Sequence, residues 1–381
     1  MNLHDLTSSQ KRILAKAENT TADELFLLSQ DCDWAVRVAV ALHPACDQEL
    51  LIKLSHDAQH QVRRTVAGSI HCTPELLSRL ANDGQMSVRC EVAHNPMCHP
   101  TLLNTMSDDP HEWVRSAVAE NRECPSPIFA KLSKDNSKAV RIAVARSSTV
   151  TSVLWDDLAR DYEREVRLAV AANPDCPGHL LQALVHDKED EVKYAAAENP
   201  HCPKETISIL AIQKDQGIRH SVASNPACPD EILKLLASDY YASIRECVAA
   251  NPNCPKDLLV SLTQDDNYRV RINAYNHHKC PILLVVNGCI DPHKLVRDDA
   301  IKILQSKKRE FWIQAVADGL SLSQSLDASS TSKNIGDLFI EIECFDAYQT
   351  IQAETIQLLI STSTTSSENY THTRKPSTLS L

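Results

Sequence analysis

Residues 166–191, VRLAVAANPDCPGHLLQALVHDKEDE, are flanked on both sides by near copies of themselves at a fixed step of 26 residues. Each copy opens on Val or Ile followed by a basic residue, and eleven such openings occur without a shift in register. These basic residues are Arg37, Arg63, Arg89, Arg115, Arg141, Arg167, Lys193, Arg219, Arg245, Arg271 and Arg297. Because insertions would appear as shifts in register, each copy is one supersecondary unit that stacks on the next. The sequence therefore predicts a solenoid, in which each unit contacts its neighbours.

Each copy has the pattern of two short helices. Asp161 precedes a run of apolar residues at three- and four-residue spacing, and we expect it to be the N-cap of the first helix. This helix should end near Asn173, because the residue before Pro174 is displaced from the helical region. Pro177 suits the first turn of a second helix, and Asp187 opens the next copy. An Asn-Pro-x-Cys-Pro turn thus joins the two helices, and the pattern leaves open whether the second is α or 3₁₀.

The repeats define the domain organisation. They cover residues 31–305 as about ten to eleven copies, preceded by a predicted N-terminal helical cap over residues 1–30. Residues 306–360 contain apolar stretches outside the repeat register, which predict a C-terminal helical cap. Residues 361–381 are rich in Ser and Thr with few apolar side chains, so we expect a disordered tail.

The pattern Val-Arg-x-Ala-Val-Ala-x-Asn-Pro-x-Cys-Pro, followed by Leu-Leu-x-x-Leu and Asp, resembles the leucine-rich repeat variant family over most of the chain. The Asp-x5-Arg opening, as in Asp161 and Arg167, is also similar to HEAT repeats. Both resemblances imply an all-α fold, and the first implies a right-handed α-solenoid of alternating α and 3₁₀ helices. An iron–sulfur cluster held by an N-terminal cysteine cluster is known beside such repeats. The first cysteine here is Cys32, so we expect no cofactor.

Composition and charge narrow the class of protein. The formal net charge of −11 argues against a protein whose main task is to neutralise phosphates. The first thirty residues lack the apolar core of a signal peptide, and no apolar run reaches membrane-spanning length. Fourteen cysteines in such a chain favour free thiols in a reducing compartment. We therefore expect a cytoplasmic monomer without a membrane partner.

Nine cysteines share one repeat position, and such a row could in principle bind a metal or form disulfides. They are Cys46, Cys72, Cys98, Cys124, Cys176, Cys202, Cys228, Cys254 and Cys280. Equivalent positions in stacked helices lie about 8–10 Å apart, whereas a disulfide needs α-carbons within roughly 7 Å. Zinc ligands must approach still closer to one ion. We therefore interpret these cysteines as small apolar side chains that fill the core.

The recurring arginines have two interpretations. They could line a groove with cations, or each could pair with an Asp of its own or an adjacent unit. Asp residues recur in nearly every copy, at Asp31, Asp57, Asp83, Asp109, Asp135, Asp161, Asp187, Asp239, Asp265 and Asp291. Matched positions favour the second interpretation, so we treat the ten arginines as a structural ladder.

The chain carries no strong signal for a metal site or for catalysis. His277, His278 and Cys280 offer three possible ligands within four residues, but without a second ligand cluster they are a weak signal. No phosphate-binding loop, nucleophile elbow, zinc-protease helix or dinucleotide fingerprint is present. We expect neither a metal nor an enzyme.

The positions that vary within the fixed frame are therefore the candidates for recognition. Those that we single out for partner binding are Trp34, His60, Met86, Trp113, Lys138, Arg164 and Tyr268. The leading hypothesis is a non-catalytic scaffold that binds another protein along its repeat surface. One alternative is a nucleic-acid-binding HEAT-like protein of the DNA-repair type, and another is a HEAT-like accessory or lyase protein that acts on a cofactor-bearing partner.

Overall fold

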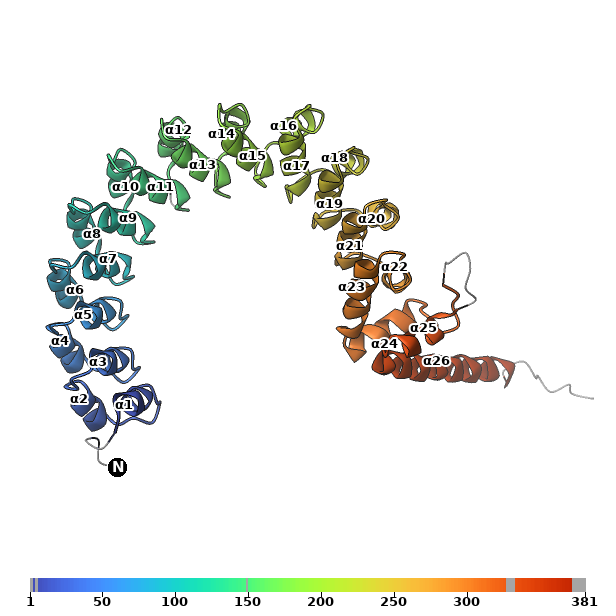
Figure 1. Cartoon of the computed structure of the whole chain (residues 1–381), viewed down its shortest axis with the longest axis horizontal. Coiled ribbons are helices and arrows are strands. Elements are labelled where there is room, and N and C mark those ends of the chain that lie inside the picture. Colours follow the sequence, from blue (N-terminus) through green and yellow to red (C-terminus); the bar gives the residue numbers. More distant parts are fainter. Residues whose placement is uncertain (1–2, 4–5, 149, 327–332, 372–381) are drawn as a thin grey trace, which may run out of the picture. The chain divides into compact units, whose positions relative to one another are not determined.

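The computed structural model describes residues 3, 6–148, 150–326 and 333–371, with residues 361–371 as backbone alone. Within these residues the regular structure is helical, apart from an isolated bridge between Ser325 and Asn334 (Figure 1). Consecutive helices pack in pairs, and the pairs stack along the chain. The predicted all-α solenoid of two-helix repeats is confirmed.

The chain divides between Pro203 and Lys204 into two compact units. The helices of unit 1 are α1 (Ser8–Leu14), α2 (Ala22–Leu28), α3 (Trp34–Ala41), α4 (Gln48–Leu54), α5 (His60–Ala67), α6 (Pro74–Leu80), α7 (Met86–His94), α8 (Pro100–Met106), α9 (Glu112–Glu120), α10 (Ser126–Leu132), α11 (Lys138–Arg146), α12 (Ser152–Ala159), α13 (Arg164–Ala172), α14 (Gly178–Leu184) and α15 (Asp190–Glu198). Those of unit 2 are α16 (Lys204–Leu210), α17 (Gln216–Ser224), α18 (Asp230–Leu236), α19 (Ala242–Ala250), α20 (Lys256–Leu262), α21 (Tyr268–Asn276), α22 (Ile282–Gly288), α23 (Lys294–Gln305), α24 (Arg309–Ala317), α25 (Ile335–Glu341) and α26 (Phe345–Thr371).

The helix boundaries agree with the predicted turn and correct two details. As expected, α13 ends at Ala172 and Asn173 is its C-cap. The second helix of the repeats is an α-helix, as α14 shows, and not the 3₁₀ helix that the family resemblance implied. The prediction that Asp161 caps α13 was wrong, because the N-cap is Glu163. Asp161 instead accepts the backbone N–H of Glu163 at 2.9 Å, and this bond shapes the turn before the helix.

Each unit presents two different faces (Figure 1). The first helices of successive repeats contact one another, from α3 to α15 in unit 1 and from α17 to α23 in unit 2. We call the surface that these odd-numbered helices form the inner face of each unit. The core between the two helix layers consists of Val, Ala and Leu side chains and the repeated cysteines, most of them almost fully buried. Such burial is the main stabilising contribution to a stack of helices this short.

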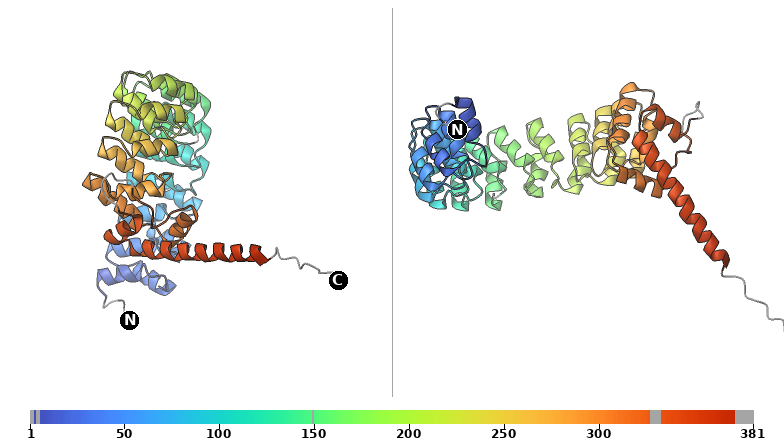
Figure 2. Two further views of the ribbon diagram at one scale, coloured as in Figure 1. Left: turned by 90° about the vertical axis from the view of Figure 1, so that its right-hand side faces the viewer. Right: turned by 90° about the horizontal axis from the view of Figure 1, so that it is seen from below.

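The C-terminal helices depart from the repeat geometry. Helices α24 and α25 contribute Trp312 and Phe339 to a core that also receives Ile351 from α26. Beyond these contacts α26 extends away from α24 and α25 (Figure 2) and reaches Thr371, inside the segment predicted to be a disordered tail. Residues 372–381 of that tail lie outside the described residues. None of the described helices, α26 included, combines the length and apolar character needed to cross a membrane.

Candidate functional site

Six of the seven candidate partner-binding residues form one row on unit 1. Trp34, His60, Met86, Lys138 and Arg164 are each the first residue of an odd-numbered helix, and Trp113 is the second residue of α9. Trp34 and Trp113 are 42% and 56% exposed. Lys138 and Arg164 are exposed as well, whereas His60 and Met86 are half-buried. The repeat frame thus brings these side chains to one edge of the inner face.

Tyr268, the seventh candidate, belongs to unit 2. It begins α21, and its ring stacks on His293 with centroids 3.9 Å apart. Tyr268 is therefore described with unit 2 and is not counted in the row on unit 1.

Ion pairs engage the cationic members of the row. The Nζ of Lys138 lies 2.9 Å from Oε1 of Glu165, and Nη1 of Arg164 lies 3.7 Å from Oε1 of Glu191. Both pairs connect adjacent repeats and are solvent-exposed, so each contributes little to stability. The aromatic end of the row lies at Trp34, on the first helix of the repeat array.

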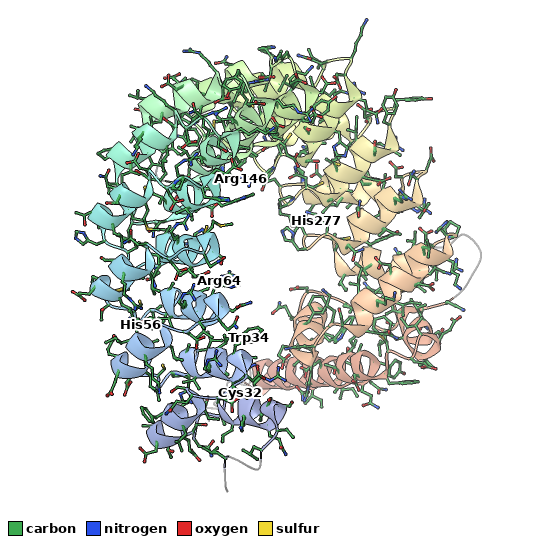
Figure 3. The ribbon with its side chains drawn as sticks, turned by 60° about the vertical axis from the view of Figure 1, so that its left-hand side comes forward. Cys32, Trp34, His56, Arg64, Arg146 and His277 are labelled. Carbon is green, nitrogen blue, oxygen red and sulfur yellow. The ribbon has the colours of Figure 1, made fainter. Side chains whose placement is uncertain are left out.

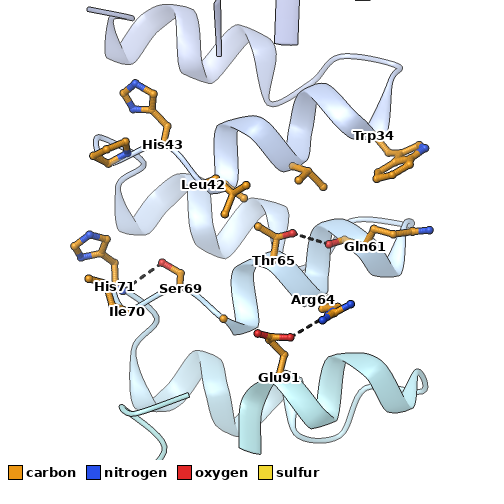
Figure 4. A pocket seen from close by; sticks show the side chains of 14 residues that line it. Trp34, Leu42, His43, Gln61, Arg64, Thr65, Ser69, Ile70, His71 and Glu91 are labelled. Atoms are coloured by element: carbon orange, nitrogen blue, oxygen red, sulfur yellow. Dashed lines mark hydrogen bonds and ion pairs between the residues drawn. The ribbon is translucent and has the colours of Figure 1, made fainter. Parts of the chain in front are cut away.

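A groove of about 660 Å³ opens at that end, between α3, α5 and α7. We call it the Trp34 groove (Figure 4). It is lined by Trp34, Val38, Ala41, Leu42, His43, Pro44, Gln61, Arg64, Thr65, Gly68, Ser69, Ile70, His71 and Glu91. Figure 3 shows Trp34 and Arg64 projecting from the inner face. The apolar part of the lining includes Leu42 and Ile70, which are 65% and 66% exposed. An apolar groove with a few polar groups is the usual form of a recognition site.

The polar side of the groove is formed by Arg64 and Glu91, and Gly68 lies next to Glu91. The Nε of Arg64 donates to Oε2 of Glu91 at 2.9 Å. A Cβ atom on Gly68 would lie 2.9 Å from Oε1 of Glu91, closer than such atoms normally approach. A side chain at residue 68 would therefore require the Glu91 side chain to shift. Among the hydrogen bonds of the described residues, Arg64 uses only its Nε, so its remaining N–H groups can meet a partner's oxygen atoms.

Sequence reasoning identified Trp34 but missed the rest of the groove. Leu42 and Gly68 share one repeat position, which carries His94, Glu120 and Arg146 in the next three copies. The presence of Leu and Gly at a position that is polar in these copies was a sequence signal for the groove. Ile70 lies in the turn after α5, at the repeat position that holds the exposed Pro44 and Pro96, so the register also marked its exposure.

The arginine ladder is held by buried ion pairs. In every complete pair, an Arg donates from Nε and Nη2 to both carboxylate oxygens of the Asp twenty residues later, as Arg167 does to Asp187. Its Nη1 donates to backbone carbonyls of its own repeat, such as Asp161 O at 2.8 Å. The other pairs are Arg37–Asp57, Arg63–Asp83, Arg89–Asp109, Arg115–Asp135, Arg141–Asp161, Arg219–Asp239, Arg245–Asp265 and Arg271–Asp291. Arg297 instead donates to backbone carbonyls of Asp291 and Pro292.

The arginines of the ladder change the pKa of the carboxyl groups that they contact, as Asp83 shows. The hydrogen bond from Arg63 lowers the pKa of the Asp83 carboxyl group, and this effect exceeds the opposing effect of burial. The Asp83 carboxylate is therefore ionised at neutral pH, and the Arg63 guanidinium faces an anion. These arginines consequently do not form a row of free cations.

Most ladder cysteines are buried and all cysteines are free thiols. Burial raises the pKa of the Cys176 thiol to about 12. Such a thiol stays protonated and packs as a small apolar group.

His277, His278 and Cys280, which were considered for a metal site, belong to the turn after α21. His277 takes the place of the turn Asn: its Nε2–H donates to Asn251 O at 2.9 Å, and its Nδ1 accepts Lys279 N–H at 3.1 Å. The His278 ring stacks on it, and the Sγ of Cys280 lies 3.8 Å from Pro281 O. Within the described residues, no three His, Cys, Asp or Glu side chains are arranged to hold a metal ion.

The buried His277 gives a pH-dependent prediction. Burial lowers its pKa, aided by His278 and Lys279 and opposed by the bond to Asn251. A lowered pKa means that the folded chain binds this proton less readily than the unfolded chain. Its contribution to stability is therefore full above pH about 6.5 and is lost as the pH falls below that value. In urea denaturation, His277→Asn should lose less stability than the wild type between pH 7.5 and 5.5. Equal losses would contradict this assignment.

Comparisons with known proteins agree with the repeat unit. The model of the leucine rich repeat variant family matches residues 164–189, which confirms the resemblance for this copy. A solved leucine-rich repeat variant with a novel repetitive structural motif is 26% identical over 58% of this chain and 88% of its own, with a TM-score of 0.45. YibA of Escherichia coli is 17% identical over 72% of this chain and 97% of its own, with a TM-score of 0.31. No curated protein matches the chain.

Proposed function

We propose that this chain is a non-catalytic scaffold that binds another protein along the inner face of unit 1, with the Trp34 groove as its anchoring site. The observation that carries the proposal is the groove itself, where exposed Trp34, Leu42 and Ile70 surround the Arg64–Glu91 pair. Trp and Arg are the residues that most often dominate binding energy in protein interfaces. The free cysteines favour a reducing compartment such as the cytoplasm as the place of this interaction.

The arrangement of charges favours a protein partner over a nucleic acid. The ladder arginines already face Asp carboxylates, and the cations of the candidate row face Glu165 and Glu191. Binding of a phosphate backbone depends on cations that can replace its counterions. A groove with one aromatic anchor and one Arg–Glu pair instead suits a peptide segment that carries apolar side chains.

Affinity capture with matched variants tests the proposal. We expect Trp34→Ala to lower the affinity for the captured partner by roughly 30-fold or more, because truncation of a central aromatic anchor removes about 2 kcal/mol or more. Val153→Ser is the control, since Val153 is an exposed apolar residue on α12, away from the groove. Partners should be recovered by the wild type and by Val153→Ser, and lost with Trp34→Ala. Recovery of the same proteins by all three forms would refute the role of the groove.

A further inference from the structure

His220 and Cys247 meet on the inner face of unit 2. His220 lies on α17 and Cys247 on the adjacent α19, and the Cys247 Sγ is 3.1 Å from the Nε2 of His220. Cys247 is half-buried and His220 is exposed, so the pair lies at the surface of unit 2. A thiol in contact with an imidazole is the arrangement that activates cysteine as a nucleophile.

The repeat frame explains why the two side chains face each other. Arg64 and Glu91 are also 27 residues apart and occupy the equivalent positions in unit 1, where they form an ion pair. The frame thus places the side chain at this position of one repeat near the side chain 27 residues later. In α17 and α19 the side chains at these two positions are the imidazole of His220 and the thiol of Cys247.

The other cysteines lack this arrangement. Burial raises the pKa of each ladder thiol and also of Cys90, whose Sγ faces the sulfur of Met86 at 3.3 Å. Cys32 is exposed, but its sulfur faces the Asp31 carboxylate at 3.8 Å. Among the side-chain contacts of the described residues, Cys247 is the cysteine that meets an imidazole.

We propose that Cys247 and His220 form a reactive thiol site that takes up a thiol group from low-molecular-weight disulfides. His220 accepts the thiol proton of Cys247. The thiolate then attacks one sulfur of the disulfide, so that a bond to Sγ forms and the disulfide bond breaks. The departing thiolate is protonated by the imidazolium. One disulfide and one protein thiol thus give one mixed disulfide and one free thiol, and excess reductant reverses the exchange.

Charged side chains adjoin both members of the pair in the sequence. Arg219, next to His220, is paired with Asp239. Glu246 adjoins Cys247 and attracts Arg269 on α21, while Asn273 of the same helix donates to the backbone carbonyl of Glu246. The contact of 3.1 Å between Sγ and Nε2 makes His220 the group that we expect to activate the thiol.

Glutathione disulfide added to the full-length protein tests the proposal. Intact-mass measurements give the rate of modification between pH 6 and 9, and peptide mapping locates the modified cysteine. We expect Cys247 to react before Cys32 and Cys90, and Cys247→Ser to remove this first modification. His220→Asn should slow the reaction at pH 7 roughly threefold or more, because a neighbouring cation raises the thiolate fraction more than it lowers nucleophilicity.

The pH profile separates activation from a merely structural role. In the wild type the rate should rise at lower pH than in His220→Asn, and His220→Lys should restore the low-pH rise by returning a positive charge. Faster modification of Cys32 or Cys90 would overturn the proposal. So would an unchanged rate and pH profile in His220→Asn, provided that circular dichroism shows a folded variant.

Discussion

Replacement of Arg167 by alanine is expected to lower the free energy of unfolding by about 3–5 kcal/mol, because it leaves the buried carboxylate of Asp187 without its partner. The two side chains are 7% and 8% exposed, and two hydrogen bonds connect them. A third bond, from Nη1 to Asp161 O, disappears as well. Asp187→Asn should destabilise less than Arg167→Ala, because an amide still accepts one of the guanidinium hydrogen bonds. Urea denaturation followed by far-ultraviolet circular dichroism measures these changes.

Arg164 provides a matched control on the same helix. It is also an arginine of α13 that faces an acid of the next repeat, but its contact with Glu191 is 3.7 Å long and the side chain is exposed. Arg164→Ala should therefore change stability by less than about 1 kcal/mol. Equal effects at Arg164 and Arg167 would show that burial of the ladder does not determine its contribution.

The second large effect is expected at the turn asparagine. Asn121 is buried, its Nδ2 donates to Ala93 O at 2.6 Å and Asn95 O at 3.1 Å, and its Oδ1 accepts Glu123 N–H at 2.8 Å. Asn121→Ala removes all three bonds and takes the side-chain partner from Ala93 O and Glu123 N–H, while Asn95 O keeps its bond from Cys98 N–H. We expect a loss of about 2–4 kcal/mol in the free energy of unfolding. The adjacent Arg122 is exposed, so Arg122→Ala should stay within about 0.5 kcal/mol of the wild type.

Asn121→His distinguishes hydrogen bonding from packing. At two copies of the turn the chain already uses histidine, as His43 and His277 make equivalent donor and acceptor bonds. We therefore expect Asn121→His to destabilise less than Asn121→Ala. The opposite order in urea denaturation would show that space around the turn, and not its hydrogen bonds, limits this position.

The sequence predicted the fold because its signals are local and repeated. The Pro after Asn173 ends α13, and the repeated apolar stripe specifies which side each helix buries. The assignment of Asp161 as an N-cap failed for a non-local reason. Its carboxylate accepts from Arg141 in the preceding repeat, a contact over twenty residues that no helix-start pattern contains.

The candidate site was less predictable than the fold. Trp34 was identified because it varies within a constant frame, but its groove depends on Ile70 in a turn and on the space above Gly68. The pair of His220 and Cys247 also escaped sequence reasoning, since each residue alone is unremarkable at its position. What joins them is the stacking distance between repeats, which a pattern within one copy does not reveal.

Because the repeat register is constant, pairs of contacting side chains on the inner face can be found from their residue numbers. A separation of 27 residues joins Arg64 to Glu91, Lys138 to Glu165, Gln216 to Ser243 and His220 to Cys247. Contacts between repeats can therefore be designed by arithmetic on residue numbers. The same rule makes the surface sensitive to length: a single residue inserted in one turn would change the numerical separation of every pair that spans it, while pairs on either side keep theirs.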